Sequence, residues 1–125
     1  MPVAIFVSSW LTVFVSSWPH HSVLPYDGNA PVTLDGTVTA ILWQDPHALI
    51  RLEVRGDSGA LDRWTIEIEG VTELTRLGWT RDAIAAGSRL RAIGAPARDG
   101  RKMLRCRTVT LPDGRTLPCF RGVTP

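Results

Sequence analysis

The sequence lacks the motifs that mark the common classes of enzyme. It has no glycine-rich phosphate loop ending in Lys-Ser or Lys-Thr, no pair of histidines at helical metal-ligand spacing, no serine nucleophile elbow and no reactive pair of cysteines. Glu67 and Glu69 share one face of an expected strand, but same-face acids on the edge of a sheet are usually solvated. Catalysis is therefore the least supported class of function, and we expect a non-enzymatic protein.

Lysine and arginine are absent before Arg51, and no apolar run is long enough to cross a membrane. Residues 3–15 are mostly apolar but fall short of the roughly 20 residues that a spanning helix needs, so no stable membrane span is expected. We interpret residues 1–17 as a signal peptide cleaved after Ser17, although no basic residue precedes the apolar run. Export then predicts a periplasmic or secreted protein. In the alternative, residues 3–15 form a buried strand or helix and stay in the mature protein.

Cysteine is also scarce, since the chain has only Cys106 and Cys119. They flank the turn Leu111-Pro112-Asp113-Gly114, and an exported protein meets an oxidising compartment in which a disulfide persists. A regular hairpin on this turn places Cys119 opposite Thr108 or Arg107, so a bond to Cys106 requires a bulge or a diagonal approach. The alternative is two inert, partly buried thiols.

The net charge of +2 conceals a gradient along the chain. All charged residues before Arg51 are acids, whereas residues 88–125 are strongly basic. Such a segment attracts nucleic acid, anionic lipid or an acidic protein, but arginines that alternate on strands are more often the solvated face of a sheet. The basic residues of this segment are Arg89, Arg91, Arg98, Arg101, Lys102, Arg105, Arg107, Arg115 and Arg121, against Asp99 and Asp113.

The length of 125 residues and the absence of internal repeats fit a single domain. Residues 18–31 are polar and rich in turn formers, which indicates an extended arm, and residues 121–125 form a tail. Between them, residues 32–120 predict the folded domain. In its first strand, residues 32–42, every second residue is apolar apart from Gly36, which leaves room for a bend or bulge. The residues expected to face the core there are Val32, Leu34, Val38, Ala40 and Leu42.

The later segments complete the order of elements. Residues 48–54 and 64–68 alternate as two strands of a hairpin, after which Val71, Leu74 and Leu77 recur at helical spacing and Gly78 ends the helix. Residues 89–95 and 102–111 predict two more strands, followed by a short run near residues 116–120. Three strands, a helix and two strands, with a long first strand that contains glycine, are typical of an OB-like five-stranded β-barrel.

A series of short motifs occurs in an order typical of one family. They are His20-His21-Ser22, Tyr26-Asp27, Pro31-Val32-Thr33-Leu34, Gly36-Thr37-Val38-Thr39, Trp43, Pro46-His47, Trp64, Gly78-Trp79-Thr80-Arg81-Asp82, Gly87 and Leu111-Pro112-Asp113-Gly114-Arg115. From about His20 to Leu117 the chain resembles the bacterial exported family of unknown function DUF6152. The resemblance implies a small, exported, OB-like β-barrel without an established activity. Two positions depart from the family pattern: Trp18-Pro19 stands where members have an alanine-type cleavage site, and Asp45 stands where they have asparagine.

OB barrels bind ligands on the face of strands two and three, between the loop after strand one and the loop after strand four. The first loop region carries Trp43 and His47, and the second carries Arg98, Arg101 and Lys102. An indole stacks on a ligand and the cations neutralise an anion, so we predict a site for a small anionic ligand or a partner protein of the cell envelope. In the alternative, Trp43 plugs the barrel end and the cations only solubilise a hairpin.

The histidines offer a second hypothesis, a copper site formed by His20, His21 and His47, because copper favours nitrogen ligands. Cleavage directly before His20 would add a terminal amine, but Pro19 is an unsuitable neighbour for that cut. Cleavage after Ser17 would make His20 the third residue. A copper chelate at that position needs a backbone amide hydrogen at the second residue, which is Pro19 and has none. In the alternative, His20 and His21 belong to a solvated arm and His47 bonds to nearby backbone.

Single-stranded nucleic acid is a third hypothesis, because OB folds bind it through aromatic residues and a cationic groove. Export argues against it, and the expected strands show no series of exposed aromatics, with Tyr26 the only tyrosine. Trp64 shares its strand parity with Ile66 and Ile68, which favours core packing over ligand contact. Trp79 follows the end of the helix and is expected to cover the bottom of the barrel.

Overall fold

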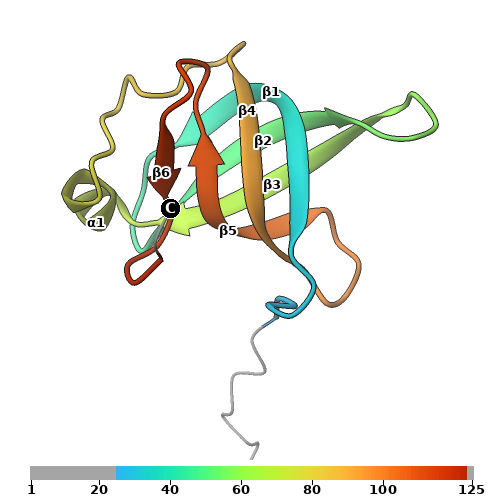
Figure 1. Cartoon of the computed structure of the whole chain (residues 1–125), viewed down its shortest axis with the longest axis horizontal. Coiled ribbons are helices and arrows are strands. Elements are labelled where there is room, and N and C mark those ends of the chain that lie inside the picture. Colours follow the sequence, from blue (N-terminus) through green and yellow to red (C-terminus); the bar gives the residue numbers. More distant parts are fainter. Residues whose placement is uncertain (1–24, 124–125) are drawn as a thin grey trace, which may run out of the picture.

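The computed structural model describes residues 25–123 of the chain (Figure 1). The predicted signal peptide, residues 1–17, lies outside these residues, as do His20, His21 and the first part of the arm over residues 18–31. Within the described part, no helix has both the length and the apolar character needed to cross a membrane.

The described chain forms strands in the predicted order, with one short helix between the third and the fourth. The elements are β1 (Val32–Leu42), β2 (His47–Arg55), β3 (Leu61–Glu69), α1 (Val71–Arg76), β4 (Arg89–Pro96), β5 (Met103–Thr110) and β6 (Thr116–Pro118). The expected strand boundaries differ from these by at most a few residues. The helix ends where predicted, and Gly78 follows it with a φ of 91°, a conformation that glycine adopts without strain.

Five of these strands close into a barrel, which confirms the predicted fold class. β1 pairs antiparallel with both β2 and β4, β2 pairs with β3, and β4 pairs with β5. The barrel closes where β3 and β5 run parallel, with Thr65 opposite Met103 and Glu67 opposite Arg105. The short β6 adds to the outer part of β5, and the β2–β3 hairpin projects away from the barrel (Figure 1). The fold is thus a mainly β, OB-like five-stranded barrel.

The core consists of apolar side chains that alternate along the strands. On β2, Ala48, Ile50 and Leu52 are buried and Arg51 is exposed, as the sequence pattern predicts. Burial of each large aliphatic side chain contributes roughly 1.5–3 kcal/mol, so this alternation fixes which face of each strand turns inward. Leu74 of α1 and Trp79, whose Nε1 donates a hydrogen bond of 2.8 Å to the carbonyl of Pro118, belong to the same core.

A bulge in β1 corrects the predicted orientation of the strand's last residues. Val38 pairs with Leu52 and Ala40 with Arg51, so Thr39 is an extra residue between two consecutive partners. The extra residue reverses the parity: Ile41 packs against the core, while Leu42 is 36% exposed. The expectation that Leu42 faces the core was therefore wrong, because a regular alternation was extended through an irregular position.

A second bulge shapes β5. Ile93 pairs with Thr108 and Gly94 pairs with Cys106, which leaves Arg107 without a partner on β4. The strands approach so closely here that a Cβ atom on Gly94 would overlap the carbonyl oxygen of Arg105 and lie 2.9 Å from the Cα of Cys106. The absence of a side chain at this one position therefore permits the bulge, and bulges re-aim the side chains next to them.

Cys106 and Cys119 are joined by a disulfide, with their Cα atoms 5.6 Å apart. The backbone of Cys119 lies opposite Arg107 and donates a hydrogen bond of 2.8 Å to its carbonyl, so the bond to Cys106 crosses diagonally. The Cys119 carbonyl also accepts a hydrogen bond of 2.9 Å from the backbone of Glu69. The segment after β6 is therefore fixed to both β3 and β5.

Candidate functional site

The residues expected to form one ligand pocket lie in different surroundings. Trp43 packs edge-to-face against Trp79, with ring centroids 6.5 Å apart, and the guanidinium of Arg81 lies 6.0 Å from its ring centroid. These contacts place Trp43 beside the segment that follows α1. Trp43 is half-buried and packs against the core. This agrees with the alternative hypothesis, in which Trp43 plugs the end of the barrel.

The three predicted cations pair with acids of their own surroundings. Arg98 lies 3.4 Å from Asp27, Arg101 lies 2.7 Å from Asp99, and Lys102 lies 3.3 Å from Asp62. The ammonium of Lys102 also lies 5.3 Å from the ring centroid of Trp64. All three cations are exposed.

His47 lies at a distance from Lys102 along β3. It pairs with Glu69, whereas the carbonyl of Lys102 accepts a hydrogen bond from the backbone of Thr65. Four residues of strand separate these two points, which corresponds to about 13 Å. The described contacts therefore do not bring Trp43 and His47 together with Arg98, Arg101 and Lys102.

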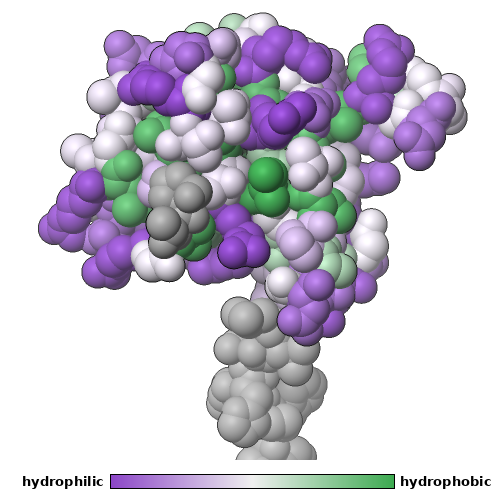
Figure 2. All heavy atoms as spheres, viewed as in Figure 1, coloured by the Kyte–Doolittle hydropathy of each residue, from purple (hydrophilic) through white to green (hydrophobic). Residues whose placement is uncertain are grey.

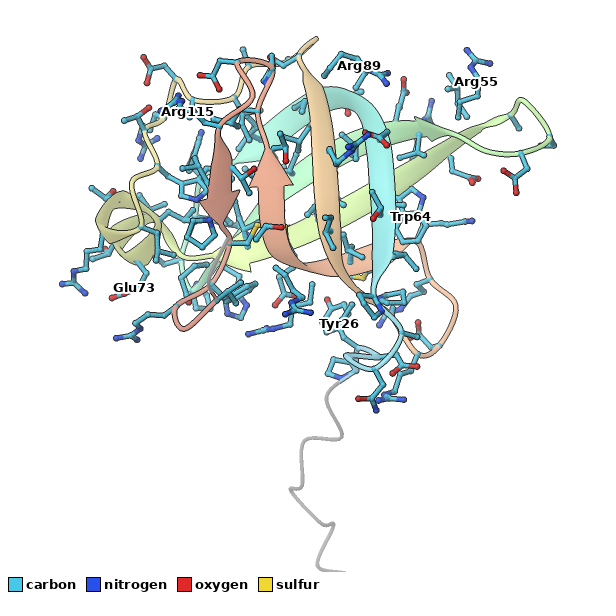
Figure 3. All side chains as sticks on the ribbon, viewed as in Figure 1. Tyr26, Arg55, Trp64, Glu73, Arg89 and Arg115 are labelled. Atoms are coloured by element: carbon cyan, nitrogen blue, oxygen red, sulfur yellow. A yellow bond between two sulfur atoms is a disulfide. The ribbon has the colours of Figure 1, made fainter. Side chains whose placement is uncertain are left out.

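His47 belongs instead to a cluster built around the carboxylate of Glu67. The Tyr26 hydroxyl donates a hydrogen bond of 2.6 Å to Oε2 of Glu67, and Nη1 of Arg105 donates one of 3.1 Å to Oε1. His47 Nδ1 lies 2.9 Å from the same Oε1. Tyr26 comes from the arm before β1 and lies at the base of the barrel (Figure 3). The other three residues come from three neighbouring strands, β2, β3 and β5.

The partial burial of Glu67 corrects the expectation that it is solvated. Its side chain is only 15% exposed. The expectation treated β3 as the edge of a sheet, but β5 pairs with it in parallel and the arm covers it through Tyr26. A carboxylate that is largely shielded from water is stable when charged or polar donors surround it, and here three groups do so.

Phe120 completes the cluster on the side of the disulfide. The Arg105 guanidinium lies 3.9 Å from the centroid of the Phe120 ring, and the His47 ring packs edge-to-face on it at 5.6 Å. Phe120 follows Cys119, so the disulfide and the backbone bonds of Cys119 place its ring. Arg105 is consequently held by a carboxylate on one side and an aromatic face on the other.

Burial and the bond to Glu67 both act on the titration of Tyr26. Burial of the phenol disfavours its charged form. The hydrogen bond to Glu67 requires the phenol proton, and the negative charge of Glu67 disfavours a negative charge on Tyr26. Together these effects raise the pKa of Tyr26 from 10.0 to about 12. Tyr26 is therefore a neutral hydrogen-bond donor at any physiological pH.

A pocket of about 350 Å³ opens next to this cluster, between the arm, β4, β5 and the segment after β6. We name it the Arg105 pocket. It combines three guanidinium groups with an apolar wall. The face of the molecule seen in Figure 2 mixes hydrophilic and hydrophobic residues. Its lining residues are Gly28, Ala95, Arg105, Cys106, Arg107, Phe120, Arg121 and Val123.

The charges around the Arg105 pocket are not balanced. Glu67 pairs with Arg105, and Arg121 lies 3.6 Å from Glu73 of α1 with 75% of its side chain exposed. Arg107, the residue of the β5 bulge, forms no ion pair with any residue from 25 to 123. A local excess of positive charge next to an apolar wall suits an anionic ligand.

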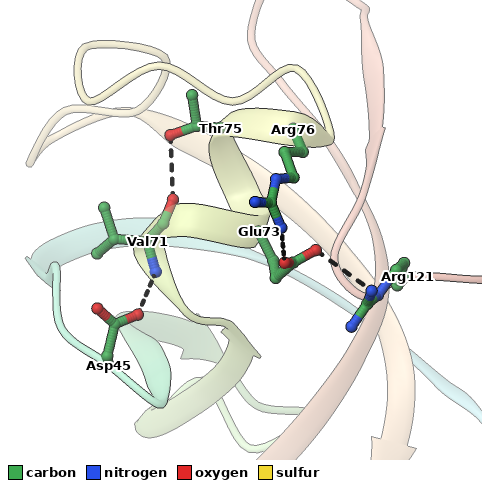
Figure 4. Close-up of polar contacts among 6 residues, drawn as sticks. All are labelled: Asp45, Val71, Glu73, Thr75, Arg76 and Arg121. Atoms are coloured by element: carbon green, nitrogen blue, oxygen red, sulfur yellow. Dashed lines mark hydrogen bonds and ion pairs between the residues drawn. The ribbon is translucent and has the colours of Figure 1, made fainter.

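The loop before β2 is fixed to the same side of the molecule through α1 (Figure 4). Asp45 Oδ1 accepts a hydrogen bond of 2.9 Å from the backbone of Val71, the first residue of the helix. A Cβ atom on Gly70 would lie 2.6 Å from the carbonyl oxygen of Pro46, so glycine permits this contact. Glu73 then bridges to Arg121 at the rim of the Arg105 pocket and to Arg76 on its own helix (Figure 4).

The described residues contain no group of three or more His, Cys, Asp or Glu side chains that could hold a metal ion. His47 and Glu67 are adjacent, but His20 and His21 lie outside the described part of the chain. The copper hypothesis thus stays a prediction.

Sequence reasoning singled out His47 but not the residues around it. Tyr26 was noted as the single tyrosine and as part of the Tyr26-Asp27 motif, and Arg105 and Arg107 were counted among solvated arginines. Glu67 and Phe120 carry no local pattern that marks them, since their contacts come from strands distant in sequence. The useful signal was the lone tyrosine in a polar arm, because Glu67 shares its strand face with Thr65 and Glu69 and not with the apolar residues.

Comparison with known families and proteins gives one match. The model of a family described as "Family of unknown function (DUF6152)" matches residues 9–105. The matched range starts and ends about eleven residues earlier in the chain than the resemblance noted from the sequence, which runs from about His20 to Leu117. No curated protein matches the chain.

Proposed function

Since the chain belongs to DUF6152, a family of unknown function, we propose its role from the Arg105 pocket: it is a non-enzymatic binding module for a small anionic ligand. We further propose that it works after export, in the periplasm or outside the cell, as an accessory protein of the bacterial cell envelope. This role keeps the ligand class predicted from the sequence and moves the site from Arg98, Arg101 and Lys102 to Arg105, Arg107 and Arg121.

The observation that carries the proposal is the convergence of three arginines on one pocket. Planar guanidinium groups bind carboxylate, phosphate and sulfate groups through paired hydrogen bonds, and they hold their charge at every relevant pH. The volume of about 350 Å³ lies near the lower end of the range for ligand pockets, so the ligand is small.

The three arginines have different parts in this proposal. Arg105 is oriented by Glu67 and Phe120 and forms the fixed wall of the pocket. Arg107 forms no ion pair within residues 25–123, and Arg121 is only loosely paired, so both are available to the ligand. Ala95, Phe120 and Val123 shield the bound group from water, which strengthens its hydrogen bonds to the arginines.

The test is a calorimetric titration of the mature protein with inorganic phosphate, sulfate and small dicarboxylates. We expect Arg107→Gln and Arg121→Gln each to weaken binding about tenfold, because a hydrogen bond between charged groups contributes roughly 1.5–3 kcal/mol. Arg55→Gln is the matched control, since Arg55 is exposed on the β2–β3 hairpin, away from Tyr26 (Figure 3). The proposal fails if none of these anions binds, or if Arg55→Gln weakens binding as much as Arg107→Gln.

A second candidate function, copper binding, has one observation in its favour. Tyr26 and His47 both contact the carboxylate of Glu67, so the arm that leads back to His21 starts beside the His47 ring. His21 precedes Tyr26 by five residues, a stretch that spans at most about 18 Å. His20 and His21 are therefore within reach of His47.

A copper titration separates the two candidates. If copper is the ligand, the mature protein takes up one ion, and His47→Ala or His20→Ala abolishes the uptake while Arg107→Gln leaves it intact. No stoichiometric uptake, or uptake that both histidine variants retain, rules out the metal site. Mass spectrometry of the exported protein tests the proposed location at the same time, because it reports whether residues 1–17 are removed.

A further inference from the structure

A second pocket, of about 310 Å³, lies on other strands than the Arg105 pocket. It is lined by residues of β1, β2 and β3, whereas the Arg105 pocket is lined from β4, β5 and the segments at both ends of the barrel. We name it the Trp64 groove. Its lining residues are Thr39, Arg51, Leu52, Arg63, Trp64 and Thr65.

Trp64 is the aromatic residue of this groove, and it is only half-buried. Its strand parity predicts core packing, and part of the ring does pack against the core. However, β5 pairs with β3 only from Thr65 to Glu67, so Trp64 lies just outside the closed part of the barrel wall. Figure 3 shows it where the β2–β3 hairpin leaves the barrel. The Lys102 ammonium lies 5.3 Å from the centroid of this ring, so the exposed part of the indole and this cation together form a rigid contact surface.

The polar groups around Trp64 alternate between donors and acceptors. Arg63 lies 3.6 Å from Glu53, and Lys102 lies 3.3 Å from Asp62 and above the indole ring. The side chain of Arg51 donates to the hydroxyl of Thr65, and the hydroxyl of Thr39, the residue of the β1 bulge, faces the Arg51 carbonyl at 3.4 Å. Each cation here already has a partner: Arg63 and Lys102 pair with acids, and Arg51 bonds the Thr65 hydroxyl.

This combination suits a neutral sugar ring. The apolar C–H face of a pyranose packs on an indole, and each sugar hydroxyl both donates and accepts, so it uses interleaved guanidinium, ammonium, carboxylate and hydroxyl groups. An anion would gain little from a rim whose cations are already engaged, two of them with acids and Arg51 with the hydroxyl of Thr65. Single-stranded nucleic acid is bound by successive stacking aromatics, and Trp64 is the only aromatic side chain that lines this groove.

We infer that the Trp64 groove is a binding site for neutral oligosaccharides, separate from the proposed anion site. The ring of one sugar residue packs on the Trp64 indole between β1 and the root of the β2–β3 hairpin, and Arg63 and Thr39 bind its hydroxyls. This face of an OB-like barrel, over strands two and three, is open to an extended ligand.

The test is a titration of the mature, isotopically labelled protein with chitotetraose, cellotetraose and maltotetraose, followed by nuclear magnetic resonance of the indole N–H groups. We expect at least one of these sugars to shift the Trp64 signal, and Trp64→Ala and Arg63→Ala each to weaken its binding about tenfold. Arg63 is exposed, so its variant tests the site even if the loss of Trp64 impairs folding. Arg107→Gln, in the Arg105 pocket, is the control and is expected to leave sugar binding unchanged.

Three results would overturn the inference: no binding of any of the three sugars, binding that Arg63→Ala and Trp64→Ala leave intact, or preferential binding of oligodeoxythymidylate that these two variants abolish. The last result would assign the groove to nucleic acid. Because Arg107→Gln and Arg121→Gln test the anion site, whereas Arg63→Ala and Trp64→Ala test the groove, failure of one site does not count against the other.

Discussion

Glu67 joins distant parts of the chain, since it contacts Tyr26, 41 residues before it, and Arg105, 38 residues after it. Its two oxygens accept bonds from Tyr26 and Arg105 and lie next to His47, so one carboxylate joins the arm, β2 and β5. Removal of this charge would leave a buried phenol and a guanidinium without their partner, and such groups are costly when unpaired. At the scale of single residues, the cluster is the least replaceable part of the site.

The titration of Tyr26 tests this cluster directly, since Tyr26 is the only tyrosine of the chain. Absorbance of the tyrosinate should give a pKa of about 12 in the folded protein, and Glu67→Gln should lower it toward 10.0. Because the folded pKa lies above the ordinary value, the stabilisation is present below pH 10 and is lost as the pH rises toward about 12. A folded protein whose Tyr26 titrates near 10, with or without Glu67, would contradict the hydrogen bond.

Among the elements, α1 depends on a residue outside its own sequence. Its N-cap position is Gly70, which has no side chain to bond the exposed N–H groups of the first turn. Asp45, from the loop between β1 and β2, supplies the missing acceptor at 2.9 Å. The cap therefore links the loop that leads into His47 to the helix that carries Glu73 and, through it, Arg121.

Substitution of Asp45 tests this link. Asp45→Ala should lower the free energy of unfolding by about 1 kcal/mol, the usual effect of removing a capping acceptor. Asp45→Asn keeps an acceptor oxygen and loses only the charge, so it should cost a few tenths of that. Denaturant unfolding measures both, with Asp57→Ala in the exposed β2–β3 turn as the control. An equal loss for alanine and asparagine would mean that the charge, not the hydrogen bond, is what matters.

The molecule as a whole combines a closed barrel with one covalent bond. The barrel itself is closed by hydrogen bonds between β3 and β5, and these need no cysteine. The Cys106–Cys119 bond adds the segment after β6 to this frame and so places Phe120 and Arg121 at the Arg105 pocket. Stability and ligand binding should therefore respond differently to its loss.

Replacement of both cysteines by alanine tests this distinction. The bond joins residues 13 positions apart, for which chain entropy predicts a stabilisation of about 3 kcal/mol. We expect denaturant unfolding to show a loss of this order and circular dichroism to show an intact barrel, whereas anion binding should weaken about tenfold as Phe120 and Arg121 lose their fixed positions. Unchanged affinity in the double variant would show that the pocket forms without the bond.

Local sequence patterns sufficed for the order of strands and helix and for most of the core. The alternation over β2 and the spacing of Val71, Leu74 and Leu77 depend only on neighbouring residues, so they can be interpreted without knowledge of the rest of the chain. The family resemblance was also visible in short ordered motifs, and the family match covers residues 9–105. Turn geometry likewise indicated that a Cys106–Cys119 bond needs a bulge or a diagonal approach.

The site required the tertiary structure, because its residues meet across strand pairs that no local pattern specifies. Periodicity through Thr39 and Arg107 continued as if each strand were regular, yet one extra residue at each bulge turned the following side chains to the opposite face. The sequence by itself therefore determined a small OB-like barrel with an excess of arginine. Only the pairing of β3 with β5, the docking of Tyr26 and the bulge at Arg107 decided which arginines share a pocket, since these depend on contacts between residues far apart along the chain.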